Sequence, residues 1–153
     1  MGILEATRYA PSCFNEQPWR FVVAKSDEGL KKMRSILVES NQVWANNALV
    51  LILILSKKDF GFNDKENYWH MFDAGTSWGY MSLEAQRRGL ITHAMGGFSK
   101  QKTKEVLNIG DKYSIIAVVA VGKLGDKEKL PEDIKKHEVP GNRKSIQELI
   151  IKK

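Results

Sequence analysis

The sequence lacks the patterns that mark common metal and nucleotide sites. Its single cysteine, Cys13, cannot form an internal disulfide, and no C-x-x-C or H-E-x-x-H motif is present. No G-x-G-x-x-G or P-loop pattern is present either, and the three histidines are scattered over different expected elements. These absences argue against a resident metal ion and against the usual phosphate loops. An enzyme built on this chain would therefore rely on an organic cofactor for its chemistry.

No apolar run in the sequence is long enough to cross a bilayer. The longest, residues 48–55, ends in Ser56-Lys57-Lys58 and predicts a buried central strand. No signal peptide is visible and one cysteine suits a reducing compartment, so we expect a cytoplasmic protein without a membrane partner. With 153 residues, 42% of them hydrophobic, we expect residues 1–153 to form a single domain.

Acidic residues are the minority, and the basic surplus lies at one end of the chain. Residues 100–153 hold thirteen basic and eight acidic side chains, whereas the rest of the chain is nearly balanced. The lysines there alternate with acidic residues, and few aromatic side chains are available to stack on bases. We therefore expect a solvated surface and no nucleic-acid partner. A single phosphate group is a better candidate ligand for this region than a nucleic acid, and Arg143 and Lys144 are the residues that could bind it.

Hydrophobic periodicity and capping residues predict helices that alternate with strands. Asp27 and Ser99 are the expected caps of two helices, and Gly89 is the expected end of the longest one. In chain order, the expected elements are a helix ending near residue 9, a strand at 21–24, a helix at 28–40, the strand at 48–55, a helix at 68–88, a short strand running into Gly96-Gly97, a helix at 100–107 and a strand at 115–121.

The segment from Pro11 to Trp19 is a polar turn directly before an apolar strand. Pro11 and Pro18 push the residues before them toward extended conformations, and Ser12 and Asn15 lie between them. Such a rigid polar loop is suited to hold a flat polar ligand. An ordinary connector between a helix and a strand has the same composition, so both interpretations remain open for this segment alone.

Glycines occur at two places in the sequence where their presence calls for a structural explanation. Gly75 and Gly79 share one side of the long helix, where each glycine costs about 1 kcal/mol relative to alanine. The close approach of another backbone or of a ligand would compensate this cost. Gly96-Gly97 either form a plain turn or direct main-chain N–H groups toward a ligand.

The last residues of the sequence are too hydrophobic to remain in solvent. Ile146, Leu149, Ile150 and Ile151 follow a charged stretch that is rich in loops. We expect this terminal segment to pack either on its own domain or on a partner.

Three separated patterns together resemble the nitroreductase family of FMN-dependent oxidoreductases. They are Ala10-Pro11-Ser12-x-x-Asn15-x-Gln17-Pro18-Trp19, the Asp73-Ala74-Gly75 helix that ends in Arg88-Gly89-Leu90, and Gly96-Gly97-Phe98. Their order follows the family pattern from Ile3 to Ile151. The resemblance implies an α+β fold with an antiparallel-dominated central sheet flanked by helices. It also implies an intertwined homodimer with an FMN in each of two interface clefts.

The resemblance assigns each cofactor contact to a residue of this chain. The implied contacts are Pro11, Ser12 and Asn15 with the flavin of the neighbouring subunit, Asn41 with the pyrimidine edge, Gly96 and Gly97 with the N5/O4 edge, and Arg143 with the FMN phosphate. Met95 is a further implied cofactor contact. Arg143 would belong to a terminal segment, about residues 140–153, that extends onto the partner subunit. No metal ligand and no catalytic side chain is implied.

The implied activity transfers hydride or electrons from NAD(P)H to nitroaromatic, quinone or similar acceptors by a ping-pong mechanism, with the chemistry at flavin N5. Family members also carry an Arg-x-Ser-x-Arg type segment ahead of the first helix, and this sequence begins after that position. The alternative is therefore a dimeric protein that keeps the fold but binds flavin poorly or is not catalytic.

Overall fold

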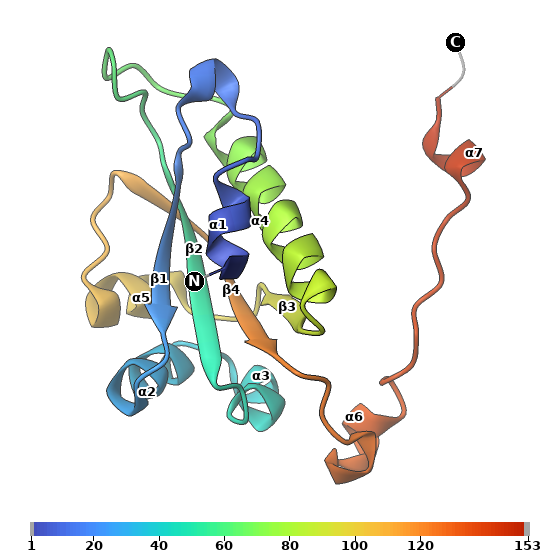
Figure 1. The fold of residues 1–153 in the computed structure, drawn as a ribbon. Coiled ribbons are helices and arrows are strands. Elements are labelled where there is room, and N and C mark those ends of the chain that lie inside the picture. The colour runs from blue at the N-terminus through green and yellow to red at the C-terminus, as the bar shows by residue number, and fades with distance from the viewer. Residues whose placement is uncertain (1, 152–153) are drawn as a thin grey trace.

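A four-stranded antiparallel sheet with the strand order β1-β2-β4-β3 forms the centre of the chain (Figure 1). The computed structural model describes residues 2–151. Its strands are β1 (Trp19–Ala24), β2 (Val50–Lys57), β3 (Ile91–Met95) and β4 (Tyr113–Gly122). The expected α+β arrangement, an antiparallel sheet flanked by helices, is confirmed.

Strand β2 is buried on both faces because it lies between β1 and β4 and because helices cover either side. Leu51, Leu53 and Leu55 point into one hydrophobic cluster, and Ile52 and Ile54 point into the other. A strand buried on both faces loses the alternation of polar and apolar residues, which explains its continuous apolar sequence. The strand predicted at residues 48–55 is confirmed, shifted by two residues.

Helices form a layer on each face of the sheet (Figure 1). Met81 packs against the isoleucine side of β2, whereas Leu30 and Met33 pack against its leucine side. The helices of the first layer are α1 (Gly2–Thr7) and α4 (His70–Arg87), and those of the second are α2 (Asp27–Ser35), α3 (Glu39–Ala45) and α5 (Lys100–Leu107). These two layers place the expected site residues on different sides of the sheet.

Ser26, rather than the expected Asp27, caps helix α2. The Ser26 hydroxyl oxygen accepts the N–H of Gly29 at 3.2 Å, and Asp27 is the first helical residue. An acidic side chain in the first turn interacts favourably with the helix dipole, so Asp27 still supports this helix end.

Helix α2 also stops earlier than the expected range 28–40. Leu37 forms an isolated β-bridge with Phe98, and the N–H of Val38 donates to the carbonyl of Gly97 at 3.1 Å. These long-range contacts override the helical periodicity of the sequence. The chain then re-enters a helix, α3, which is not among the expected elements.

The ends of helices α4 and α5 confirm two sequence predictions. Gly89, directly after the C-cap of α4, has φ +68°, a conformation that favours glycine. Ser99 caps α5, because its hydroxyl oxygen accepts the N–H of Lys102 at 3.2 Å. No helix within residues 2–151, α4 included, is both long and apolar enough to span a bilayer.

Residues 123–151 extend away from the sheet as a C-terminal arm (Figure 1). The arm contains the short helices η2 (Lys127–Lys129), α6 (Glu132–Lys135) and α7 (Ile146–Leu149). The apolar side chains at its end, Ile146, Leu149, Ile150 and Ile151, stay exposed, up to 89% for Ile151. Packing on its own domain, one of the two alternatives left open by the sequence, is therefore wrong for the described part of the arm.

Candidate functional site

Asn41 and Gly97, separated by 56 residues in the sequence, are joined by a hydrogen bond. The Asn41 Nδ2 group donates to the Gly97 carbonyl at 3.0 Å, and the N–H of Val38 donates to the same oxygen at 3.1 Å. Two donors fix the orientation of this peptide group. The N–H of Gly97 has no protein acceptor among residues 2–151. The structure thus unites two predicted site residues and leaves a main-chain donor available to a ligand.

The two neighbouring glycines differ in the space around them. A Cβ atom on Gly97 would lie 2.6 Å from Asn41 Nδ2 and 2.9 Å from Val38 Cγ2, so only glycine fits there without displacement. A Cβ atom on Gly96 would meet nothing within 4 Å. Met95, directly before them, points its side chain into the core, so only its main chain can face a ligand.

Trp44 and His93 border the same edge of the sheet and are not among the predicted site residues. Their ring centroids lie 4.6 Å apart, and β3, which carries His93, is an edge strand. Trp44 follows Asn41 by three residues on α3, which places both on one helical face. Recognising α3 as a helix would have been the signal that identifies Trp44.

The loop 11–17 lies where α4 begins, at the opposite end of the strands from α3 (Figure 1). The N–H of Cys13 donates to Asp73 Oδ2 at 3.0 Å, and the Asp73 side chain is buried. The Ser12 hydroxyl oxygen accepts the N–H of Gln17 at 3.0 Å. Ser12 therefore stabilises its own loop, and the buried carboxylate of Asp73 fixes the loop on α4.

An open hollow of about 260 Å³ separates this loop from the start of α4. Exposed aromatic rings supply much of its wall, and the Trp69 and Phe72 centroids lie 6.3 Å apart. Its lining residues are Pro11, Ser12, Cys13, Trp69, Phe72 and Asp73. The wall is largely apolar and carries one carboxylate, so it suits an aromatic ring better than a phosphate group.

The predicted site residues occupy three separate places in one copy of the chain. The loop 11–17 lies on the α4 side of the sheet, and Asn41 with Gly97 lies on the α3 side (Figure 1). Arg143 lies on the C-terminal arm, where its Nη1 atom contacts the carbonyls of Gly141 and Asn142 at 3.4 and 3.3 Å. A single copy therefore does not bring all predicted contacts to one cleft.

One exposed stripe of helix α4 combines glycines with large apolar side chains. A Cβ atom placed on Gly75 or Gly79 would meet nothing within 4 Å, so the expected close approach is absent within residues 2–151. Phe72 and Leu83, at helical spacing from these glycines, are 72% and 74% exposed. The stripe is therefore available for a surface outside this copy of the chain.

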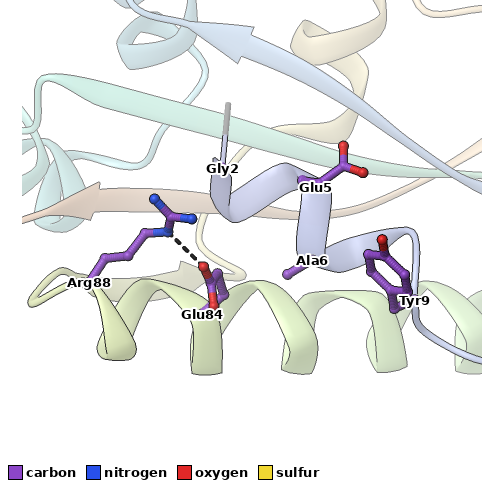
Figure 2. A pocket seen from close by; sticks show the side chains of 6 residues that line it. All are labelled: Gly2, Glu5, Ala6, Tyr9, Glu84 and Arg88. Atoms are coloured by element: carbon purple, nitrogen blue, oxygen red, sulfur yellow. Dashed lines mark hydrogen bonds and ion pairs between the residues drawn. The ribbon is translucent and has the colours of Figure 1, made fainter.

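A second open hollow, of about 310 Å³, lies between α1 and the C-terminal end of α4 (Figure 2). Glu84 accepts hydrogen bonds there from Arg87 and Arg88, both at 2.7 Å, and these bonds lower the pKa of Glu84 to about 2. A carboxylate paired in this way is a poor proton acceptor near neutral pH. The hollow is lined by Gly2, Glu5, Ala6, Tyr9, Glu84 and Arg88, none of them a predicted site residue.

Residues 75–79 read G-x-S-x-G, the pattern of a serine nucleophile turn. They lie in the middle of α4 rather than at a turn from strand to helix. The Ser77 side chain is buried, and its hydroxyl donates to the Ala74 carbonyl at 2.8 Å. Ser77 is therefore part of the helix packing and not a nucleophile.

The fold is that of an α+β protein, and its predicted site residues lie apart from one another, with Asn41 and Gly97 on the α3 side of the sheet and the loop 11–17 on the α4 side. A profile of the Nitroreductase family matches residues 1–123. The chain belongs to the nitroreductase family, and the resemblance found in the sequence is confirmed.

Two relatives show how far the similarity extends. A protein assigned as the NAD(P)H nitroreductase YdgI of Bacillus subtilis is 27% identical over 159 residues, 81% of this chain and 76% of that protein. A 15.4 kDa protein of Mycolicibacterium smegmatis is 33% identical over 101 residues, 66% of this chain and 66% of that protein. The chain thus matches slightly less than two thirds of the second relative.

Two solved structures share the fold. An oxidoreductase described as containing FMN superposes with a TM-score of 0.91 at 38% identity, covering 97% of this chain and 77% of its own. A protein of Exiguobacterium sibiricum assigned as a nitroreductase, in complex with FMN, has a TM-score of 0.80 at 22% identity, covering 99% and 84%. FMN, the cofactor expected for the family, is confirmed as the cofactor of both structures.

Proposed function

We propose that this chain is an FMN-dependent oxidoreductase that takes hydride from NAD(P)H and reduces nitroaromatic, quinone or similar acceptors in a ping-pong cycle. We further propose that residues 1–153 act as a single domain in the cytoplasm, and that two copies associate as a homodimer. Family membership and the FMN-containing structure at 38% identity support a flavin oxidoreductase. The identity of the acceptors and the ping-pong order of the cycle are the more specific parts of the proposal.

The observation that carries the proposal is the bond between Asn41 and Gly97. It holds a main-chain N–H beside a side-chain amide whose Oδ1 atom has no donor among residues 2–151. One donor and one acceptor along an open edge match the polar rim of an isoalloxazine ring. Gly96 keeps the adjacent main chain accessible, because no atom lies within 4 Å of a Cβ placed there.

The remaining predicted contacts fit the other parts of FMN. The Arg143 guanidinium contacts two carbonyls at long range, 3.4 and 3.3 Å, and so retains donors for the oxygens of a phosphate group. Bound FMN would supply hydride acceptance from the nicotinamide and electron donation to the acceptor. The chain would bind and orient the cofactor and leave one ring face accessible, without a side chain as acid or base.

A second copy would complete the site that one copy leaves in separate places. The exposed stripe of α4 and the apolar end of the C-terminal arm are surfaces that a partner would cover. Through such contacts the loop 11–17 of one copy would face the Asn41 edge of the other. The cofactor contacts predicted for Pro11, Ser12, Asn15, Asn41, Met95, Gly96, Gly97 and Arg143 belong to this proposal.

Reconstitution with FMN tests the proposal. The purified protein should be yellow, or should keep the yellow colour after incubation with FMN and removal of the free cofactor, and should then oxidise NAD(P)H in the presence of menadione or a nitroaromatic compound. Sedimentation should show a dimer. A protein without measurable FMN affinity would contradict the proposed function.

A further inference from the structure

His70 is the first residue of helix α4, and the proposed function makes no use of its ring. The Nδ1 atom of the ring is buried and has no hydrogen-bond partner among residues 2–151. The Nδ2 group of Asn67, a fully buried residue three positions earlier, has none within these residues either. Native structures leave few buried polar groups unpaired, so each one calls for an explanation. A neutral imidazole can leave Nδ1 without a proton, whereas the imidazolium places an N–H there with no acceptor.

The surroundings of His70 also oppose its protonation. Burial lowers the pKa of His70 below the ordinary value of 6.5, and the positive charge of Lys58 acts in the same direction. The carboxylates of Asp59, Glu66 and Asp73 act in the opposite direction without reversing the shift. The N-terminal end of α4 adds a partial positive charge. The folded state therefore favours the neutral ring, and acidification below the ordinary pKa destabilises the arrangement around it.

The first turn of α4 joins the central strand to the loop 11–17. The hydroxyl of Ser56, a fully buried residue of β2, donates to the His70 carbonyl at 2.7 Å. Asp73, one turn further along α4, accepts the N–H of Cys13 at 3.0 Å. An imidazolium at His70 would attract the Asp73 carboxylate, because residues three apart share a helical face. It would thus compete with the Cys13 N–H for the carboxylate that fixes the loop on α4.

We propose that His70 is a pH-sensitive switch: the neutral ring keeps the loop 11–17 attached to the first turn of α4, and protonation in mildly acidic solution releases the loop. The switch itself requires only the contacts within one chain. Its consequence for the cofactor rests on the proposed function, since the loop carries Ser12 and Asn15, which are predicted to contact the flavin of the partner. Release of the loop would then lower the affinity for FMN.

Hydrogen exchange of the main-chain N–H groups of the loop 11–17 tests the switch in the full chain. The reference is His70→Gln, which stays neutral, and each comparison is made at one pH, so the intrinsic exchange rate cancels. We expect the ratio of the wild-type rate to the His70→Gln rate to rise about three- to tenfold from about pH 7.5 to about pH 5.5, because the released state binds one more proton. His137→Gln, which removes an exposed histidine of the C-terminal arm, should behave like the wild type.

Lys58→Gln provides a second variant that leaves the histidine in place. The main-chain bonds of Lys58 with Lys112 and Asn67 do not involve its side chain. Removal of its charge makes protonation of His70 easier in the folded state, so the acid response should become smaller than in the wild type. A rate ratio that stays constant between the two pH values, or an equal acid response in Lys58→Gln and the wild type, would overturn the switch. Loss of the near-UV circular dichroism signal over the same interval would also overturn it, by showing that the whole chain unfolds.

Fluorescence titration with FMN tests the consequence separately. The Kd of the wild type for FMN should rise about three- to tenfold relative to that of His70→Gln over the same pH interval. Loop release without this change would contradict the role of the loop in cofactor binding and would still support the switch. A protein that does not bind FMN at all would overturn the proposed function, whereas the exchange measurement, made without FMN, would still decide the switch.

Discussion

At the scale of single residues, the structure assigns different tasks to two adjacent glycines. A Cβ atom on Gly97 would lie 2.6 Å from Asn41 Nδ2, whereas one on Gly96 would contact nothing within 4 Å. We expect Gly97→Ala to lower the free energy of unfolding by about 1 to 3 kcal/mol, because it forces atoms apart in a packed region. Gly96→Ala should change it by less than about 1 kcal/mol. Urea unfolding measures both, and equal losses would contradict the close packing at Gly97.

Asn41 allows stability to be separated from cofactor binding. On the same helix, Gln42 Nε2 donates to the Leu37 carbonyl at 2.8 Å, which makes Gln42→Ala a matched control for Asn41→Ala. Each variant should lose about 0.5 to 1.5 kcal/mol of stability through its lost hydrogen bond. Only Asn41→Ala should weaken FMN binding, about tenfold if one net contact disappears. Fluorescence titration with FMN measures this, and equal affinities in the two variants would exclude Asn41 from the site.

At the scale of elements, the C-terminal end of α4 should make stability depend on acid pH. Hydrogen bonds from Arg87 and Arg88 lower the pKa of Glu84 from 4.5 to about 2. The folded state therefore favours the ionised carboxylate, and its stabilisation is complete above the unfolded pKa and lost as pH falls from about 4.5 toward 2. The Tm advantage of the wild type over Glu84→Gln should be present at pH 6 and shrink toward pH 2. A constant difference would contradict this role of the ion pairs.

The glycine stripe of α4 yields a second prediction at this scale. No atom within residues 2–151 lies within 4 Å of a Cβ placed on Gly79, so Gly79→Leu should leave the monomer folded. A partner packed on the stripe would be pushed away, and we expect the dimer dissociation constant to rise about tenfold or more. Glu105→Leu, an exposed change on α5, is the control. Sedimentation velocity measures both, and an unaffected dimer in Gly79→Leu would place the partner elsewhere.

Helix and strand ends that depend only on neighbouring residues could be predicted from the sequence. Three such features were predictable: the cap of α5 at Ser99, the end of α4 at Gly89 and the apolar run of β2. Each depends on residues close to it in the sequence, through capping, turn preference or hydrophobic patterning. The break after α2 was not predictable, because it depends on the bridge between Leu37 and Phe98, 61 residues apart. Helix α3 was missed for the same reason, and with it the pairing of Trp44 and His93.

At the scale of the whole molecule, the sequence predicted a set of site residues that one copy of the chain does not bring to a single place. Asn41 and Gly97 were assigned to the flavin by resemblance, and the structure adds the hydrogen bond between them. In one copy, the loop 11–17 and the C-terminal arm that carries Arg143 remain separate from α3, which carries Asn41 (Figure 1). The resemblance already assigned the contacts of Pro11, Ser12 and Asn15 to the flavin of a second copy, and their separation from Asn41 in one copy agrees with that assignment without testing it.

Mixing two variants tests most directly whether each flavin site is shared between two copies. Asn41→Ala removes a contact from one edge, and Asn15→Gly removes one from the loop while keeping the left-handed backbone at φ 57°. Each variant alone should bind FMN weakly. After subunit exchange in an equimolar mixture, the mixed dimers would hold one intact site each, and random pairing restores roughly a quarter of all sites to wild-type affinity. An FMN titration that shows no recovery would contradict the shared site.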